Sequence, residues 1–210
     1  MKLLLLIGSV FFINCSKAQL PDDVTDSRKK NESVLKLPPG EMRNELAFFT
    51  MAGIDESMGK ARIDKIAFSD VGPAFMTFNG NNISATVTTA PFLPAKHKLD
   101  YDEKYLIKID RKPYYGGYGA IPKTAIGKVT MVVNSDTISI PSTAYSDLYN
   151  LNFSYLNKGT QKSTNGIYRS SDGTRLYLYI FCKDATGSYE VTWVFINRRY
   201  ARRILDYGFM

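Results

Sequence analysis

The C-terminal stretch 175–209 carries the longest strand pattern in the chain and most constrains its fold. Residues 176–183 alternate between two largely apolar faces, which is typical of a central strand. A second β-rich run, residues 189–196, follows the small, turn-favouring residues 184–188 and has the pattern of a half-buried strand. After a reversal, residues 200–207 form a third run. The sequence therefore predicts a three-stranded antiparallel meander at this end.

Strand parity assigns different roles to two neighbouring arginines of this stretch. If a two-residue turn joins the last two strands, Arg202 shares a face with Trp193 and Asp206, and Arg203 lies on the opposite face. We therefore expect Arg202 to lie over Trp193 or to pair with Asp206, which is a structural role. Arg203 is expected to join the two arginines of the turn in a weak basic surface patch.

The rest of the chain adds short strands and one helix. β-Branched and aromatic runs separated by Gly-, Pro- and Asn-rich turns span 61–69, 74–78, 83–89, 104–110, 128–133 and 137–140. Residues 41–51 place apolar side chains at helical spacing among charged ones. With 210 residues, 44% of them hydrophobic, the chain has enough length for one sizeable core. We predict a mainly β, single-domain antiparallel sandwich or curved sheet over residues 38–210, with one N-terminal amphipathic helix.

The N-terminus has the pattern of an export signal. Lys2 precedes an apolar run of about a dozen residues, which is too short to span a bilayer and typical of a signal peptide. Small residues at 16 and 18 would allow cleavage after residue 18 and release of a soluble chain. Residues 12–15 also resemble a bacterial lipobox, with Asn14 where a small residue is usual. Cleavage after residue 14 would leave Cys15 lipidated and the protein anchored to a membrane.

These two processing routes stay open, and both predict an exported bacterial protein. It would be periplasmic, secreted or a membrane-anchored lipoprotein. Residues 19–37 are polar and poor in apolar side chains, so we expect a flexible segment behind the signal. Because Cys15 is removed or acylated, Cys182 is left as the one internal thiol, and we expect no intramolecular disulfide.

Several chemistries find little support in the sequence. The single histidine, His97, lies between lysines, so we expect no metal site and no cofactor. Cys182 shares a strand face with apolar residues and reads as a buried, inert thiol. The formal net charge is +7, but basic and acidic residues are interleaved, so we expect no nucleic-acid partner.

Two carboxylates could support a hydrolase acting on carbohydrate. Asp184 and Glu190 lie near the ends of predicted strands, and glycoside hydrolysis uses a pair of such acids on either side of the scissile bond. The competing interpretation is a turn aspartate and an exposed strand glutamate, and it is the one we favour.

The most unusual local composition is the glycine-rich stretch 114–119. Its tyrosines, Tyr114, Tyr115 and Tyr118, would suit recognition of a protein or a sugar if they are exposed, because each offers a flat apolar face and a hydroxyl. Arg111 would make such a surface basic. Alternatively, the tyrosines fold onto the sheet. The function predicted from sequence is a non-catalytic binding or interaction module for a protein partner or an envelope glycan.

Overall fold

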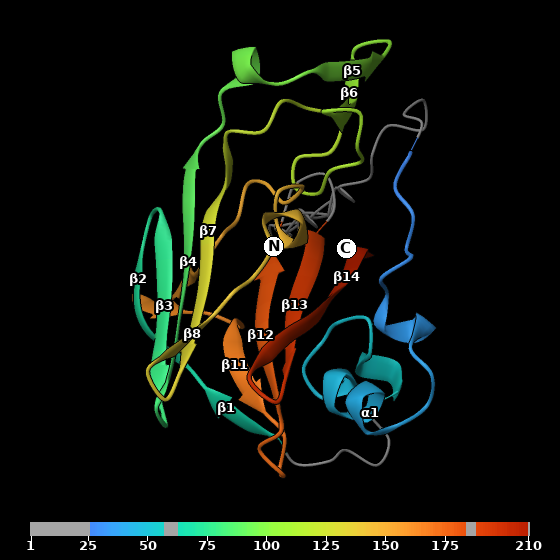
Figure 1. The fold of residues 1–210 in the computed structure, drawn as a ribbon. Coiled ribbons are helices and arrows are strands. Elements are labelled where there is room, and N and C mark those ends of the chain that lie inside the picture. Colours follow the sequence, from blue (N-terminus) through green and yellow to red (C-terminus); the bar gives the residue numbers. More distant parts are fainter. Residues whose placement is uncertain (1–25, 57–62, 184–187, 210) are drawn as a thin grey trace, which may run out of the picture.

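The computed structural model describes residues 26–56, 63–183 and 188–209. Within these ranges the chain is mainly β, with antiparallel sheets and one α-helix (Figure 1). The sheet that contains the C-terminus, here the C-terminal sheet, has the strand order β1 (Asp64–Ile66), β11 (Gly166–Arg169), β12 (Arg175–Cys182), β13 (Ser188–Ile196) and β14 (Arg199–Phe209). The middle sheet has the order β2 (Phe68–Gly72), β3 (Phe75–Gly80), β4 (Ile83–Pro91), β7 (Thr124–Val133) and β8 (Asp136–Ile138).

Smaller elements complete the fold. Two short hairpins pair β5 (Leu99–Asp102) with β6 (Tyr105–Ile109), and β9 (Tyr155–Asn157) with β10 (Thr160–Lys162). The helix α1 spans Glu41–Ala47, and single 3-10 turns lie at η1 (Val34–Lys36), η2 (Ile54–Glu56), η3 (Pro94–Lys96) and η4 (Ser142–Ala144). None of the helices in the described ranges is long and apolar enough to cross a membrane. The predicted signal and Cys15 lie outside the described residues.

One face of each five-stranded sheet contributes side chains to a shared hydrophobic cluster. The middle sheet contributes Met76 and Phe78, and the C-terminal sheet contributes Val191 and Trp193, all at most 1% exposed. Their alternation along each strand follows the period of two that places every second side chain on one face. Within β13, the indole Nε1 of Trp193 donates to the carbonyl of Ala144 at 2.9 Å, so the one polar atom of this ring is satisfied.

The outer face of the C-terminal sheet is covered as well. Residues 33–52, here the N-terminal layer, lie over it and place Val34 and Leu46 against Tyr177 and Val194 in a second cluster. The prediction that β13 is half buried is therefore wrong, because both of its faces are covered along almost its whole length. An alternating sequence pattern cannot reveal a covering segment that comes from more than a hundred residues away.

Buried carboxylates attach the N-terminal layer to the sheet. Asp206 accepts a hydrogen bond from the backbone N–H of Val34 at 2.9 Å. Glu45 of α1 lies 2.8 Å from the Nε of Arg175 and also accepts from the hydroxyl of Tyr177. Hydrogen bonds to charged groups are stronger than neutral ones, so these contacts fix the layer where it lies.

A β-bulge reverses the predicted parity of the last strand. Asn197 and Arg198 have φ of 49° and 60° and form the expected two-residue turn. In β14, however, Tyr200 pairs with Phe195 and Arg202 pairs with Val194, so Ala201 is an extra residue.

The two arginine predictions are therefore wrong. Beyond the bulge, Arg203 lies opposite Trp193 and Arg202 is exposed. The side chain of Arg203 is 9% exposed and contacts Glu32 at 2.6 Å and Asp147 at 2.5 Å.

The polar segment before the domain is packed from residue 26 onward. The guanidinium of Arg28 lies 3.9 Å from the ring centre of Tyr118 and 4.4 Å from that of Tyr207. The backbone N–H of Leu205 in β14 donates to the carbonyl of Glu32 at 3.0 Å, and this segment runs beside β14 in Figure 1. In the described part of the segment 19–37, cation–π contacts and edge hydrogen bonds attach the chain to the sheet.

Candidate functional site

The tyrosines of the glycine-rich stretch are not exposed. Tyr114, Tyr115 and Tyr118 are 0%, 7% and 1% exposed, and Gly116 and its neighbouring glycines have positive φ, which curls the stretch back onto the protein. The hydroxyl of Tyr114 donates to the carbonyl of Ala120 at 2.9 Å, and burial raises the pKa of this tyrosine. The interpretation of an exposed recognition loop is wrong, and the alternative of packed tyrosines holds.

Arg111 does not build a binding surface with these rings. It is exposed and has a φ of 65° in the turn after β6. Tyr114 and Tyr118 are buried in a cluster with Leu106 and Tyr149, and Tyr115 is buried in the cluster that the two large sheets share. A ligand at Arg111 would therefore not reach the faces of these rings.

Glu190, the carboxylate proposed for hydrolysis, has a structural environment. It is 2% exposed and accepts hydrogen bonds from the N–H groups of Met51 at 2.7 Å and Ala52 at 2.9 Å, and from the hydroxyl of Tyr179 at 2.8 Å. Burial raises the pKa of Glu190 to about 7. Glu190 was expected to be an exposed strand residue, and it lies instead beneath the N-terminal layer. Asp184 lies outside the described residues.

The other candidate groups are also held by the protein. Cys182 is buried, and its thiol donates to the carbonyl of Asn150 at 3.1 Å. The Nδ1 of His97 lies 2.8 Å from a carboxylate oxygen of Asp110, and its ring stacks on Phe92. Over the described ranges, no three His, Cys, Asp or Glu residues come together as a metal site.

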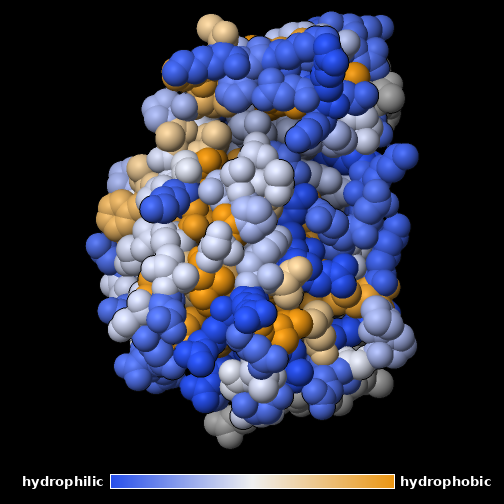
Figure 2. Space-filling model, in the orientation of Figure 1, coloured by the Kyte–Doolittle hydropathy of each residue, from blue (hydrophilic) through white to orange (hydrophobic). Residues whose placement is uncertain are grey.

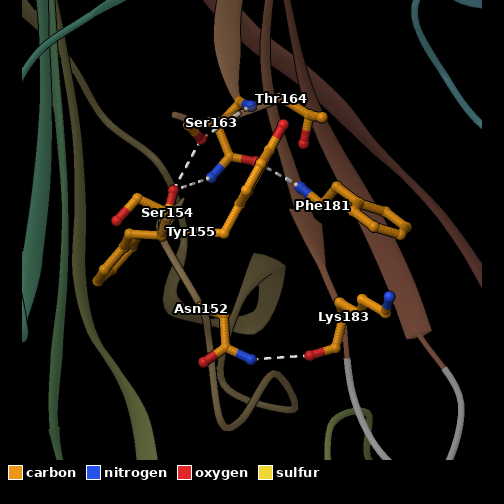
Figure 3. A pocket seen from close by; sticks show the side chains of 9 residues that line it. Asn152, Ser154, Tyr155, Ser163, Thr164, Phe181 and Lys183 are labelled. Carbon is orange, nitrogen blue, oxygen red and sulfur yellow. Dashed lines mark hydrogen bonds between the residues drawn. The ribbon is translucent and has the colours of Figure 1, made fainter. Parts of the chain in front are cut away.

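A pocket of about 320 Å³ lies beside the end of β12 (Figure 3). Three segments form its walls, two of them on either side of the β9–β10 hairpin and the third at the end of β12. The lining residues are Asn152, Phe153, Ser154, Tyr155, Ser163, Thr164, Asn165, Phe181 and Lys183. Its volume lies at the lower end of the range typical of small-molecule sites. None of these residues was a candidate from the sequence, because 152–155 has no clear pattern and 163–165 reads as a polar loop.

Side-chain amides and hydroxyls fix the pocket walls. Asn165 is 1% exposed, accepts from the N–H of Phe181 at 2.8 Å and donates to the carbonyl of Phe153 at 3.0 Å. Asn152 donates to the carbonyl of Lys183 at 2.7 Å, a contact visible at one end of the pocket in Figure 3. Ser163 donates to the same Phe153 carbonyl at 2.7 Å. The pocket is therefore preformed.

The chemistry of the lining suits binding without catalysis. Tyr155, which is 52% exposed, and the partly buried Phe181 supply aromatic rings, and most of the other lining side chains are uncharged and polar. Among the described residues of the lining, Lys183 brings the one charged side chain, and no carboxylate or imidazole accompanies it. Such a site can hold a ligand by apolar contact and a few hydrogen bonds.

No known protein family, curated protein or solved structure matches this chain.

Proposed function

We propose that the protein is a non-catalytic binding module and that the pocket beside β12 is its ligand site. The observation that carries this proposal is a preformed pocket whose described lining has three aromatic residues, uncharged polar groups and one lysine, but no carboxylate. Glycoside hydrolysis needs two suitably spaced carboxyl groups. The one described candidate, Glu190, is engaged by two backbone N–H groups and a tyrosine under the N-terminal layer. The competing hydrolase function therefore has less support.

The surroundings of the pocket favour a partner larger than a free metabolite. Leu156 of the neighbouring β9–β10 hairpin is 77% exposed, and Tyr155 before it is 52% exposed. Elsewhere, on the face seen in Figure 2, hydrophobic residues lie in small groups between hydrophilic ones. Adjacent exposed apolar side chains at a pocket rim are typical of sites that a macromolecule covers. A protein partner and an envelope glycan are the two ligand classes that fit.

Binding to chemically defined probes tests this function. We expect short peptides or N-acetylglucosamine oligosaccharides to bind the wild-type chain in calorimetry. Phe181→Ala and Tyr155→Ala should each weaken that binding by about tenfold, because aromatic anchors dominate interfaces. Tyr101→Ala is the matched control, since Tyr101 is 48% exposed in the β5–β6 hairpin. Equal affinities for all variants would show that the ligand binds elsewhere, and no binding of either class would count against the function.

The proposed location of the module is the cell envelope, on the strength of the N-terminal sequence alone. Cys15→Ala should move the protein from the membrane fraction to the soluble fraction if that cysteine carries a lipid. Soluble fractionation of both forms would favour cleavage after residue 18. We further propose that the two five-stranded sheets form a sandwich on which the pocket is built.

A further inference from the structure

The pocket lies where the C-terminal sheet loses a strand. The ladder between β11 and β12 ends at the pair Gly166 and Tyr179, whereas β12 continues to Cys182. Beyond Tyr179, the side of β12 that β11 had covered receives no backbone partner from β11. The pocket lies on this side, since Phe181 and Lys183 belong to its lining.

Two asparagine amides occupy the ends of this gap. The Oδ1 of Asn165 accepts from the N–H of Phe181, as a carbonyl of a longer β11 would do. The Nδ2 of Asn152 donates to the carbonyl of Lys183, as a backbone N–H would do. These side chains therefore continue the hydrogen-bond ladder by one bond at each end.

Two backbone groups between the asparagines are left open. In a strand, the N–H and C=O of one residue point to the same side, and successive residues alternate. Arg175 faces the β11 side, because its carbonyl accepts from the N–H of Ser170, so Phe181 and Lys183 face that side too. Across the described ranges, the carbonyl of Phe181 and the N–H of Lys183 have no hydrogen-bond partner. An acceptor and a donor are thus presented to the pocket.

We propose that the pocket accepts an extended peptide segment, which adds to β12 as a short antiparallel strand. This inference rests on the proposed binding function and names the ligand class. One peptide residue with its two flanking peptide groups fills the gap. The carbonyl before that residue accepts from the N–H of Lys183, and the N–H after it donates to the carbonyl of Phe181.

An acetamido sugar matches these two groups less well. The N–H and C=O of a trans amide point in opposite directions, so one acetamido group could satisfy either the acceptor or the donor, but not both. An extended peptide presents an N–H and a C=O from residues two apart to the same side. The backbone geometry therefore favours a peptide over an acetamido group.

Strand pairing also indicates which side chains would fit. The peptide residue opposite Lys183 would place its side chain on the same face as that cation, which favours an acid. The residue opposite Phe181 would lie beside this ring, which favours an aromatic side chain. The residue between them would point to the face of Cys182 and Phe153, which belong to the core cluster, so it should be small. The expected order is acidic, small, aromatic.

Titration of ¹⁵N-labelled protein with the blocked tripeptide acetyl-Glu-Ala-Phe-amide tests the proposal. We expect the amide resonance of Lys183 to shift, because its N–H gains an acceptor. The matched ligand carries an N-methyl group on the backbone nitrogen of its phenylalanine, which removes the donor to the Phe181 carbonyl and keeps every side chain. Loss of one hydrogen bond should weaken binding by about tenfold. Equal binding of the two peptides would overturn the proposal.

A pair of variants tests the same hydrogen bond from the protein side. Lys183→Ala keeps the backbone N–H, whereas Lys183→Pro removes it. We expect at least tenfold weaker peptide binding for the proline variant than for the alanine variant. If the proline variant does not fold, the two peptides still decide the question.

The remaining outcomes separate this inference from the proposed function. Resonance shifts of pocket residues with N,N′-diacetylchitobiose but not with the peptide would keep the binding function and overturn strand addition. No shift of any lining residue with either probe would overturn both. Slow hydrogen exchange of the Lys183 amide in the free chain would show that another segment already fills the gap, and would also overturn the proposal.

Discussion

Arg203 illustrates how one inserted residue decides what a side chain does. Without Ala201 as a bulge, strand parity would place Arg203 on the outer face of β14. With the bulge, it lies opposite Trp193 and bridges Glu32 of the N-terminal segment and Asp147 of the segment after η4. An arginine that is 9% exposed between two carboxylates joins three distant parts of the chain.

Removing this arginine should destabilise the protein strongly. Arg203→Ala leaves two carboxylates without their cation, and breaking such a buried pair costs about 3–5 kcal/mol. We expect a loss of about 3 kcal/mol in the free energy of unfolding in urea, because Glu32 and Asp147 are partly exposed. Arg202→Ala is the control, with an expected change within about 0.5 kcal/mol. The reverse order of the two effects would contradict the bulged register.

Glu190 should make the stability depend on pH. Burial raises its pKa to about 7 in the folded chain, from an ordinary value of 4.5. Between these values the folded chain binds more protons than the unfolded chain, so the free energy of unfolding falls as the pH rises from about 5 to 7. One pKa unit corresponds to about 1.4 kcal/mol, which gives a fall of about 3 kcal/mol.

The substitution Glu190→Gln should flatten this dependence, because the side chain no longer titrates. Urea unfolding at pH 5, 6, 7 and 8 gives the free energy of unfolding of each variant. Glu103→Gln, at an exposed residue of the β5–β6 turn, is the control. Asp206, which pairs with Glu190 across the strands, and Tyr179 remain in both variants. If Glu190→Gln keeps the slope of the wild type, another group is responsible for it.

Among the elements, the glycine-rich stretch 114–119 is positioned by its backbone. Gly116 has a φ of 94°, and a Cβ at this position would lie 2.0 Å from the carbonyl oxygen of Tyr149. Close approach of two backbones, rather than flexibility, explains this glycine. The stretch pairs Tyr115 with Leu148 and thereby holds the segment that leads to the pocket.

Two glycine substitutions separate close approach from backbone strain. Gly116→Ala should destabilise the protein by about 3 kcal/mol or more in thermal or urea unfolding, because strain and overlap act together. Gly159→Ala, at a φ of 77° in the β9–β10 turn with nothing within 4 Å, carries only the backbone strain of about 1–2 kcal/mol. Similar losses at the two positions would argue against the tight packing of the tyrosine stretch.

The elements that the sequence predicted are those whose signal is local. Period-two alternation located the strands of the terminal meander, and the residues around Asn197 located its last turn. The Asn-Gly pair lies at the end of β3, and the turn itself is formed by the next two residues, Asn81 and Asn82. The run predicted for 61–69 is two strands, β1 and β2, in different sheets. The bulge at Ala201 could not be predicted, because its neighbours are equally good strand residues. The pocket was missed because it forms where β11 stops pairing with β12, at Gly166. This point depends on the hydrogen bonds of Asn165 to Phe153 and Phe181, which the sequence does not reveal.

At the scale of the whole molecule, the sequence predicted a mainly β antiparallel chain and not what covers it. The composition of residues 26–37 is polar, yet this segment carries Val34 and Leu37 into the second cluster and Arg28 onto two tyrosine rings. Few apolar residues suffice when the opposite surface already offers aromatic rings. Composition averages over a segment, whereas packing depends on the positions of two or three side chains.

The N-terminal layer should therefore unfold together with the sheets and not before them. Leu46 of α1 is fully buried against the outer face of the C-terminal sheet, so Leu46→Ala should lower the free energy of unfolding by about 2–5 kcal/mol. Met131 of the middle sheet belongs to the cluster that the two large sheets share, and not to the cluster of Leu46. If the protein unfolds as one cooperative domain, Leu46→Ala should lower the free energy of hydrogen exchange at the Met131 amide by the same amount. Leu156→Ala, at a leucine that is 77% exposed, should change the stability by less than about 0.5 kcal/mol. The contrary outcome is that Leu46→Ala accelerates amide exchange in the N-terminal layer and leaves the Met131 amide as protected as in the wild type. The layer would then be a separate unit that unfolds on its own.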